Sequence, residues 1–280
     1  MEIIRSVAEM TAWSRRMRQA GRTICLVPTM GFFHAGHLQL IRQGRQEADR
    51  LVVSLFVNPT QFGPKEDYSR YPRDLERDAG LAVEEKADIL FVPENNDMYT
   101  AGFQTRIRVC RLTETLCGAQ RPGHFDGVAT VVAKLFNIIR PHNAIFGEKD
   151  FQQLAVIRRL VQDLNFDVSV LGHAIVREND GLAMSSRNSY LNEEERQSAL
   201  CLSKSLQLAR QQVAAGDVDV AMVLAAIESH IRSYAGVVSE YIKIVDQNSL
   251  LDKQTVDETG VLVMAVRVGK TRLIDNGCLI

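Results

Sequence analysis

Short apolar runs alternate with helical patterns over about the first 175 residues of the chain. Between Gly127 and Ile139, large apolar residues recur every three or four positions, which gives one helix a continuous apolar face. Strand–helix alternation predicts an α/β fold with a Rossmann-like, doubly wound parallel sheet, whose ligands bind at the carboxyl ends of the strands. The runs that we interpret as strands are Ile24–Val27, Leu51–Val57, Ile89–Val92, Ala144–Phe146 and Phe166–Leu171.

The pattern changes after Val176. Two charged helical stretches, Glu193–Ala214 and Val218–Tyr234, follow a polar loop. Three strand-like runs then follow, the last two joined by the short connection Gly269-Lys270, which is typical of a hairpin. We therefore expect residues 1–175 to form the sheet domain and residues 176–280 to form a second, smaller α+β domain. The three runs are Val238–Val245, Gly260–Val268 and Thr271–Asp275.

The first predicted strand leads into Pro28-Thr29-Met30-Gly31-Phe32-Phe33-His34-Ala35-Gly36-His37, and Leu38 opens a helical pattern. A strand, a glycine-bearing turn and a helix start bring free backbone N–H groups and the positive end of the helix dipole together, which favours an anion. Because a glycine separates His34 from His37, both imidazoles can face a phosphate. The alternative interpretation is a purely structural turn, and we favour a nucleotide site.

Polar clusters also follow other predicted strands. Asn58–Gly63 contains a proline, a glycine and Gln61, whose amide both donates and accepts hydrogen bonds. Arg121–Val128 leads into the clearest helix with an arginine and a histidine, which again favours an anion. The alternative for the first loop is a surface turn. The alternative for the second is a helix capped by Asp126.

The strand end at Phe146 continues as Gly147-Glu148-Lys149-Asp150, followed by a helical pattern. Lys149 supplies a mobile point charge suited to a phosphate. Asp150 and Gln153 would share one face of the helix start, and without function they would be an N-cap and its capping-box partner. That alternative leaves Gly147 and Lys149 unexplained.

Two further motifs lie in the last hundred residues. Met184-Ser185-Ser186-Arg187 follows Asp180-Gly181, and its hydroxyls and guanidinium could clamp phosphate oxygens as a mobile lid. Val268–Thr271 ends like a Walker A loop, but Met264 stands where that motif needs its first glycine. We therefore exclude a P-loop.

Together these motifs resemble the pantothenate synthetase (pantoate–β-alanine ligase) family of the H-x-G-H nucleotidylyl-transferase superfamily. The resemblance rests on the motifs P-T-M-G-x-x-H-x-G-H at Pro28–His37, N-P-x-Q-F-G at Asn58–Gly63 and E-D-x-x-x-Y-P-R at Glu66–Arg73. Met184–Asn188 is similar to the superfamily's K-M-S-K-S loop, with Ala183 in place of the first lysine. The order and spacing of the strings fit the family, while the C-terminal third matches more loosely.

The resemblance implies residue roles. His34, His37, Lys149 and Arg187 would be catalytic. Gln61 and Gln153 would bind pantoate, and Gln61 would also lie beside β-alanine. ATP would contact Met30, Gly31, Phe32, Phe33, His34, Ala35, Gly36, His37, Gly147, Glu148, Lys149, Asp150, Val176, Met184, Ser185, Ser186 and Arg187.

The resemblance also implies the reaction. Pantoate would be adenylated by ATP, and β-alanine would displace AMP to form the amide of pantothenate. Mg²⁺ would arrive on the triphosphate, since no dedicated metal site is visible in the sequence. A homodimer held by the N-terminal domain is implied too, with the C-terminal domain acting as a lid. The rival hypotheses are a cytidylyl- or adenylyl-transferase with another small acceptor, and a non-catalytic nucleotide sensor.

Composition narrows the class of protein. The 33 basic and 34 acidic residues give no support for nucleic-acid binding, so we expect none. No apolar run is long enough for a membrane span, and the N-terminus lacks a signal-peptide pattern. The five cysteines form no C-x-x-C pair, which disfavours zinc ligation and a disulfide framework. We expect a cytoplasmic protein that binds small molecules and no membrane.

Overall fold

A computed structural model describes residues 1–64 and 66–280, and over these residues it contains a six-stranded sheet and a three-stranded sheet. All neighbours in the larger sheet pair in parallel, as predicted. The strand order changes direction at the β2–β5 pair, with β3 on one side of it and β6 on the other. This change of direction opens a crevice at the carboxyl ends of the strands. The order is β1 (Glu2–Ile4), β4 (Ile89–Phe91), β3 (Arg50–Leu55), β2 (Ile24–Thr29), β5 (Asn143–Gly147) and β6 (Ser169–His173).

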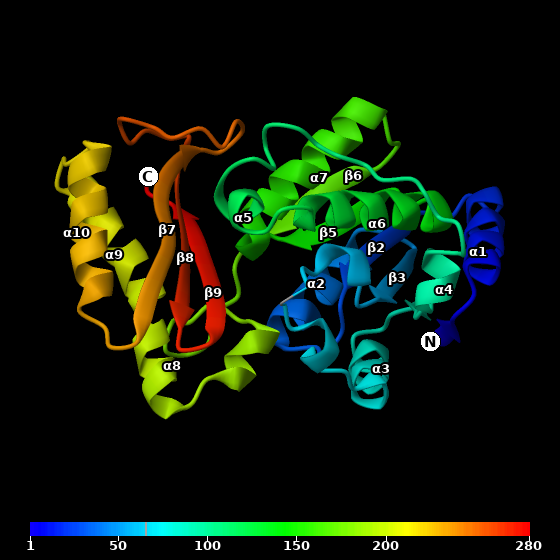
Figure 1. Cartoon of the computed structure of the whole chain (residues 1–280). Helices are drawn as coiled ribbons and strands as arrows, with labels where there is room; N and C mark the ends of the chain where they lie inside the picture. The colour runs from blue at the N-terminus through cyan, green and yellow to red at the C-terminus, as the bar shows by residue number, and fades with distance from the viewer. Residues whose placement is uncertain (65) are drawn as a thin grey trace.

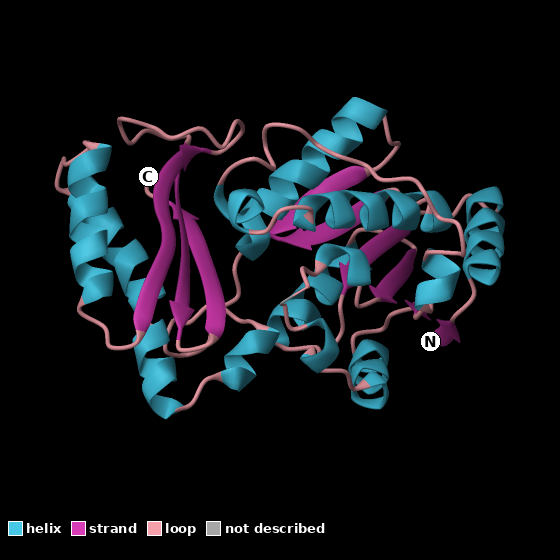
Figure 2. Ribbon diagram, in the orientation of Figure 1, coloured by secondary structure: helices cyan, strands magenta, loops and turns pink. Residues whose placement is uncertain are grey.

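Helices cover both faces of this sheet (Figures 1 and 2). Alternate residues of the central strand β2 belong to different cores, since Ile24 and Leu26 pack on one face and Cys25 and Val27 on the other. A strand buried on both faces reads as a continuous apolar run, which is why the sequence shows it clearly. α1 (Val7–Gln19), α6 (His124–Ile139) and α7 (Phe151–Leu164) cover the first face, and α2 (Ala35–Gln46) and α3 (Leu75–Glu84) the second.

The smaller sheet is antiparallel and stands beside the parallel sheet in Figure 1, drawn in orange and red. Apolar side chains of two helices pack against it in a separate core. Val268 pairs with Thr271, so Gly269-Lys270 is the predicted hairpin turn and the Walker-like string is no P-loop. The elements are α8 (Glu193–Ala199), α9 (Cys201–Ala214), α10 (Val220–Arg232), β7 (Val237–Asp246), β8 (Gly260–Val268) and β9 (Thr271–Cys278).

Several predicted boundaries were wrong. β1 was missed because three residues paired only with β4 are too short to show a pattern. β6 begins at Ser169 rather than Phe166, whose ring packs on Phe136 from the preceding loop. The helix predicted over Glu193–Ala214 is two helices that meet at the buried Leu200.

Short helices complete the described chain, within which no helix is long and apolar enough to cross a membrane. They are η1 (Pro59–Gln61), η2 (Tyr68–Arg70), α4 (Asn95–Met98), α5 (Leu116–Gln120), η3 (Glu148–Asp150) and η4 (Ser186–Tyr190).

Candidate active site

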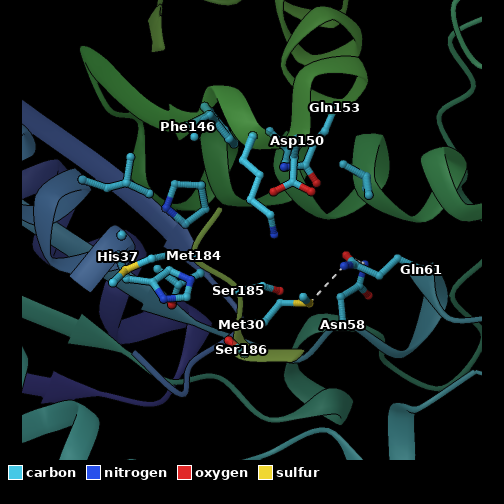
Figure 3. A pocket seen from close by; sticks show the side chains of 18 of the residues that line it. Met30, His37, Asn58, Gln61, Phe146, Asp150, Gln153, Met184, Ser185 and Ser186 are labelled. Carbon is cyan, nitrogen blue, oxygen red and sulfur yellow. Dashed lines mark hydrogen bonds between the residues drawn. The ribbon is translucent and has the colours of Figure 1, made fainter. Parts of the chain in front are cut away.

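A cleft of about 240 Å³ opens at the carboxyl ends of β2, β3, β5 and β6. Most of the predicted site residues meet there, from five separate segments of the chain, and Gln61 and Gln153 are among them. Figure 3 shows Asp150 and Gln153 approaching the cavity from one side, with Ser185 and Ser186 lying across from them. The predicted ATP-binding residues that line the cleft are Met30, His34, Gly36, His37, Gly147, Lys149, Asp150, Val176, Met184, Ser185, Ser186 and Arg187.

The other predicted ATP-binding residues, Gly31, Phe32, Phe33, Ala35 and Glu148, do not line the cleft. Phe33 is fully buried in the core under α2 and α3, and the backbone N–H groups of Phe32 and Phe33 donate to a buried carboxylate at 2.6 and 2.7 Å. That carboxylate belongs to Asp78, which sequence reasoning missed. These residues shape the turn that presents the histidines.

His34 and His37 cap the helix they begin. His34 is the N-cap of α2, and its Nδ1 accepts a hydrogen bond from Gly36 N–H at 3.1 Å. The Nδ1 of His37 accepts from His34 N–H at 3.3 Å, and the ring centroids lie 4.0 Å apart. Since each Nδ1 is an acceptor, each neutral ring carries its proton on Nε2. Two Nε2–H donors are therefore available to an anion at the helix start.

Both histidines are kept neutral by their surroundings. Burial lowers the pKa of His34 to about 4, and the neighbouring Lys149 charge adds to this effect. Burial also lowers the pKa of His37 well below its usual value, with the His34 ring and Lys149 contributing. At neutral pH the pair thus acts through hydrogen-bond donation rather than through charge.

The glycine between the histidines is needed for their packing. A Cβ on Gly36 would lie 2.9 Å from Cε1 and 3.0 Å from Nδ1 of His34. Real Cβ atoms essentially never approach other atoms closer than 3.0 Å, so a side chain here would push the ring out of its capping position. The glycine of the H-x-G-H string thus leaves room for the His34 ring.

Lys149 and Asp150 bring opposite charges into the cleft from η3. Desolvation by the cleft walls lowers the pKa of the Lys149 ammonium, while the nearby Asp150 carboxylate opposes that shift. Within residues 1–64 and 66–280, Lys149 forms no ion pair. Asp150 is the N-cap of α7, yet its side chain accepts no capping hydrogen bond. The capping box considered for Asp150 and Gln153 is therefore wrong, and both side chains remain available to a ligand.

The Met184–Arg187 segment is held on the opposite side of the cleft. Ser185 caps η4 by accepting from Arg187 N–H at 3.3 Å, and Ser186 Oγ donates to Phe32 O at 3.4 Å. Nε and Nη2 of Arg187 donate to both carboxylate oxygens of Asp67 at 3.0 and 2.9 Å. Nη1 is not used in this pair. Arg187 can therefore keep its ion pair and still offer donors to the cleft that it lines.

Gln61 is fixed by neighbours on both sides of its amide. Its Oε1 accepts from Asn58 Nδ2 at 3.1 Å, and its Nε2 contacts Met30 Sδ at 3.1 Å, the dashed line in Figure 3. Its backbone O lies 2.8 Å from Nδ1 of His124, and Arg121 Nη1 lies 3.1 Å from Nε2 of that ring. Arg121 can only donate, so His124 donates from Nδ1 to Gln61 O.

The apolar stripe predicted for α6 has two roles. Part of it packs in the core, and part of it walls the cleft beside Gln61 and Gln153. This wall is branched and aliphatic, so it suits a small ligand with a methyl-bearing centre and polar ends. The side chains of α6 that face the cleft are Val128, Val131, Val132 and Leu135.

The chain resembles characterised ligases along its whole length. Residues 2–278 match the family described as Pantoate-beta-alanine ligase. The chain is 53% identical to the pantothenate synthetase of Syntrophus aciditrophicus, covering 99% of this chain and 96% of the relative. It is 55% identical to that of Geobacter sulfurreducens, covering 99% and 98%.

Solved structures agree with these relatives. The pantothenate synthetase of Thermus thermophilus superposes with a TM-score of 0.95 at 46% identity, covering 100% of this chain and 99% of that one. The pantoate-beta-alanine ligase of Francisella tularensis, solved with beta-gamma ATP and beta-alanine, gives a TM-score of 0.81 at 33% identity, covering 100% and 98%. The chain therefore belongs to the pantoate-beta-alanine ligase family, whose members form an amide bond.

Proposed function

We propose that this chain joins pantoate to β-alanine with ATP, through a pantoyl-adenylate intermediate. The observation that carries the proposal is the meeting of two kinds of groups in one cleft. Anion-binding donors lie on one part of it, namely the His34–His37 pair, Lys149 and Arg187. Neutral amides and an aliphatic wall lie on the other. The Francisella relative's complex with beta-gamma ATP and beta-alanine supports the same ligands here.

In the first half-reaction, a pantoate carboxylate oxygen attacks the α-phosphorus of ATP and pyrophosphate leaves. The two Nε2–H groups at the start of α2 donate to phosphoryl oxygens, where negative charge develops. Lys149 and Arg187 neutralise the departing pyrophosphate from opposite sides. Gln61 and Gln153 hold the pantoate hydroxyls and carboxylate without adding charge, while α6 contacts its methyl groups.

In the second half-reaction, the β-alanine amine attacks the acyl carbon of the adenylate. The new C–N bond forms as the bond to AMP breaks, and the amine loses one proton. No nucleophilic side chain is needed, because the adenylate is already activated. Gln61, beside this acyl carbon, also orients the amine.

Magnesium fits the same cleft. Among the residues that the structure describes, no cluster of three His, Cys, Asp or Glu could hold a metal. The carboxylate that lines the cleft is Asp150, which is not used as a helix cap. One carboxylate together with substrate phosphates is the usual way in which Mg²⁺ is held. The ion would supply further neutralisation of the triphosphate charge.

We also propose a homodimer formed through the N-terminal domain. Segment 104–110, which belongs to no helix or strand, supports it, because its backbone N–H groups make few hydrogen bonds within the described chain, that of Ile107 to Thr130 Oγ1 among them. Backbone N–H groups without partners can pair with a second copy of the chain. Light scattering should report twice the mass of the chain, and a single mass would contradict the dimer. The boundary at residues 175 and 176, the lid role of the second domain and the cytoplasmic location stay predictions.

The reaction is tested by mixing the protein with ATP, pantoate and β-alanine and measuring AMP. Pantoate alone should support exchange of labelled pyrophosphate into ATP, since the adenylate forms before β-alanine acts. AMP formation without any such exchange would contradict the intermediate. A transferase with another acceptor would turn over only with that acceptor, and a nucleotide sensor would bind ATP without turnover.

A further inference from the structure

One side chain of the second domain, which the proposed mechanism does not use, contacts the turn that carries Lys149. Asn276, in β9, is 7% exposed. Its Nδ2 donates to the backbone oxygens of Glu148 and Lys149 at 3.0 and 2.8 Å. Both protons of the amide are thus used on consecutive carbonyls of η3. This turn carries Lys149, which lies 127 positions away in the chain.

The preceding residue of β9 anchors the strand in this place. Asp275 is 2% exposed, and its carboxylate accepts two hydrogen bonds from Arg177 at 2.7 and 2.9 Å. Arg177 also donates to Gly181 O at 3.1 Å, at the base of the loop that continues to Met184. Asp275 further accepts from the backbone N–H of Asn276 at 2.8 Å. Two adjacent residues of β9 therefore contact segments on both sides of the cleft.

The position of η3 matters because Lys149 is a long, flexible side chain whose direction depends on its backbone. A displacement of about 1 Å in a reacting group can cost on the order of 100-fold in rate. Without the Asn276 amide, two carbonyls at the interface would each lose a donor, and η3 would lose its hydrogen-bonded link to β9. An asparagine suits this place, since it donates twice and brings no charge near the ammonium.

We propose that Asn276 is a positioning residue for adenylation, which acts by holding the Lys149 backbone in the orientation that points its ammonium into the cleft. The inference rests on the proposed role of Lys149. It assigns to the second domain a direct part in building the site, independent of any lid movement.

The test measures pantoate-dependent exchange of pyrophosphate into ATP in the full-length protein. Asn276→Asp keeps the shape but cannot donate, and Asn276→Ala removes the amide without adding charge. Both should lower the exchange rate about 10- to 100-fold, while the KM for pantoate stays within about threefold. Asn276→Ser, which keeps one donor, should fall between Ala and the unchanged protein. The control Asn248→Asp, at an exposed turn of the same domain, should change nothing.

The same substitution made in a Lys149→Ala variant separates a positioning role of Asn276 from a general loss of structure. In Lys149→Ala, adding Asn276→Ala should lower neither the residual rate nor the affinity for ATP measured by titration calorimetry, because the two residues act through one group. If Asn276→Ala lowered the exchange rate of Lys149→Ala as much as it lowers that of the unchanged protein, the inference would be overturned. Full activity of both Asn276→Asp and Asn276→Ala, with Lys149→Ala slow, would overturn it as well. Full activity of Lys149→Ala would instead overturn the role proposed for that lysine and the inference with it. Melting temperatures of all variants show which of them remain folded at the assay temperature.

Discussion

Arg187 and Asp67 form a two-point ion pair across 120 residues of sequence, with N–O distances of 2.9 and 3.0 Å. The guanidinium also lies 5.8 Å from the centre of the Tyr71 ring. The two segments that these residues belong to come from different parts of the chain, and both border the cleft. The pair decides how Arg187 is presented, since Nε and Nη2 face the carboxylate and Nη1 stays outside the pair.

We expect Asp67→Asn to weaken this presentation and lower the adenylation rate by roughly tenfold, because the guanidinium loses its charged anchor. Arg187→Ala should lower the rate further, by about 10²- to 10³-fold, with the fold intact. Pyrophosphate exchange and far-UV circular dichroism measure the two effects. Asp163→Asn, which breaks an exposed pair with Arg159 one helical turn away, is the matched control. An unchanged rate in Arg187→Ala would remove this arginine from the mechanism.

The lid hypothesis makes a separate prediction about the Met184–Arg187 segment. If ATP with Mg²⁺ closes the segment over the phosphates, its amide hydrogen exchange should slow when nucleotide is added. Mass spectrometry of the peptide that covers Ser185 and Ser186 measures this. Equal exchange with and without nucleotide would favour a permanently ordered loop, for which the Ser186–Phe32 hydrogen bond already provides an anchor.

His37 should contribute as a neutral donor. His37→Ala should lower the rate of adenylate formation by about 10²- to 10³-fold, the usual scale for one electrostatic contact with a transition state. Because the pKa of His37 is already well below its usual value, the rate should not rise between pH 6 and 7 through loss of a proton from this ring. Rapid-quench measurement of the adenylate tests both statements. A variant that forms adenylate at the unchanged rate would contradict them.

Gln61 and Gln153 should select pantoate rather than ATP. Alanine at either position should weaken pantoate binding at least tenfold, since a buried polar group of the ligand loses its partner, and it should leave ATP affinity within about twofold. Titration calorimetry with each ligand gives both numbers. The exposed Gln207→Ala is the control. If ATP affinity fell and pantoate affinity did not, the two subsites would have to be exchanged.

The buried His124 should make the free energy of unfolding depend on pH. Burial lowers the pKa of this ring to about 4, and the Arg121 charge contributes to the shift, whereas an unfolded histidine titrates near 6.5. The unfolded chain therefore binds the proton first as the pH falls. The stabilising contribution is complete above pH 6.5 and is lost between 6.5 and about 4, by up to about 3 kcal/mol. Denaturation curves of the unchanged protein and His124→Gln should converge over that range, and parallel curves would contradict the assignment.

Gly127, the glycine of α6, should not tolerate a side chain. A Cβ there would lie 2.4 Å from Thr60 O, so alanine would push η1 and Gln61 away from the helix. We expect a loss of about 1–3 kcal/mol in the free energy of unfolding, as for other overpacked sites, together with weaker pantoate binding. Gly80→Ala, in an exposed helix position with open space around the Cβ, should instead be neutral or stabilising by up to about 1 kcal/mol.

The sequence by itself determined the parallel sheet, the second sheet and most of the candidate site. Central strands such as β2 are buried on both faces, so each appears in the sequence as a continuous apolar run. The His34–His37 arrangement is equally local, because a capping box joins the N-cap residue of α2 to the residue three positions later. The start of β6 could not be read in the same way, since Phe166 is apolar for its packing on Phe136 and not for a place in a strand.

Only the tertiary structure decided which distant groups hold the site residues. Asp78 binds the Gly31–Phe33 turn and Asp67 binds Arg187, but no sequence pattern near these partners indicates either contact. Asn276 lies just beyond the predicted strand Thr271–Asp275 and belongs to no motif, and its two hydrogen bonds to η3 exist only because β9 packs against the parallel-sheet domain. Hydrogen bonds between segments so far apart in the chain depend on how whole units pack, and no short pattern of residue types carries that information.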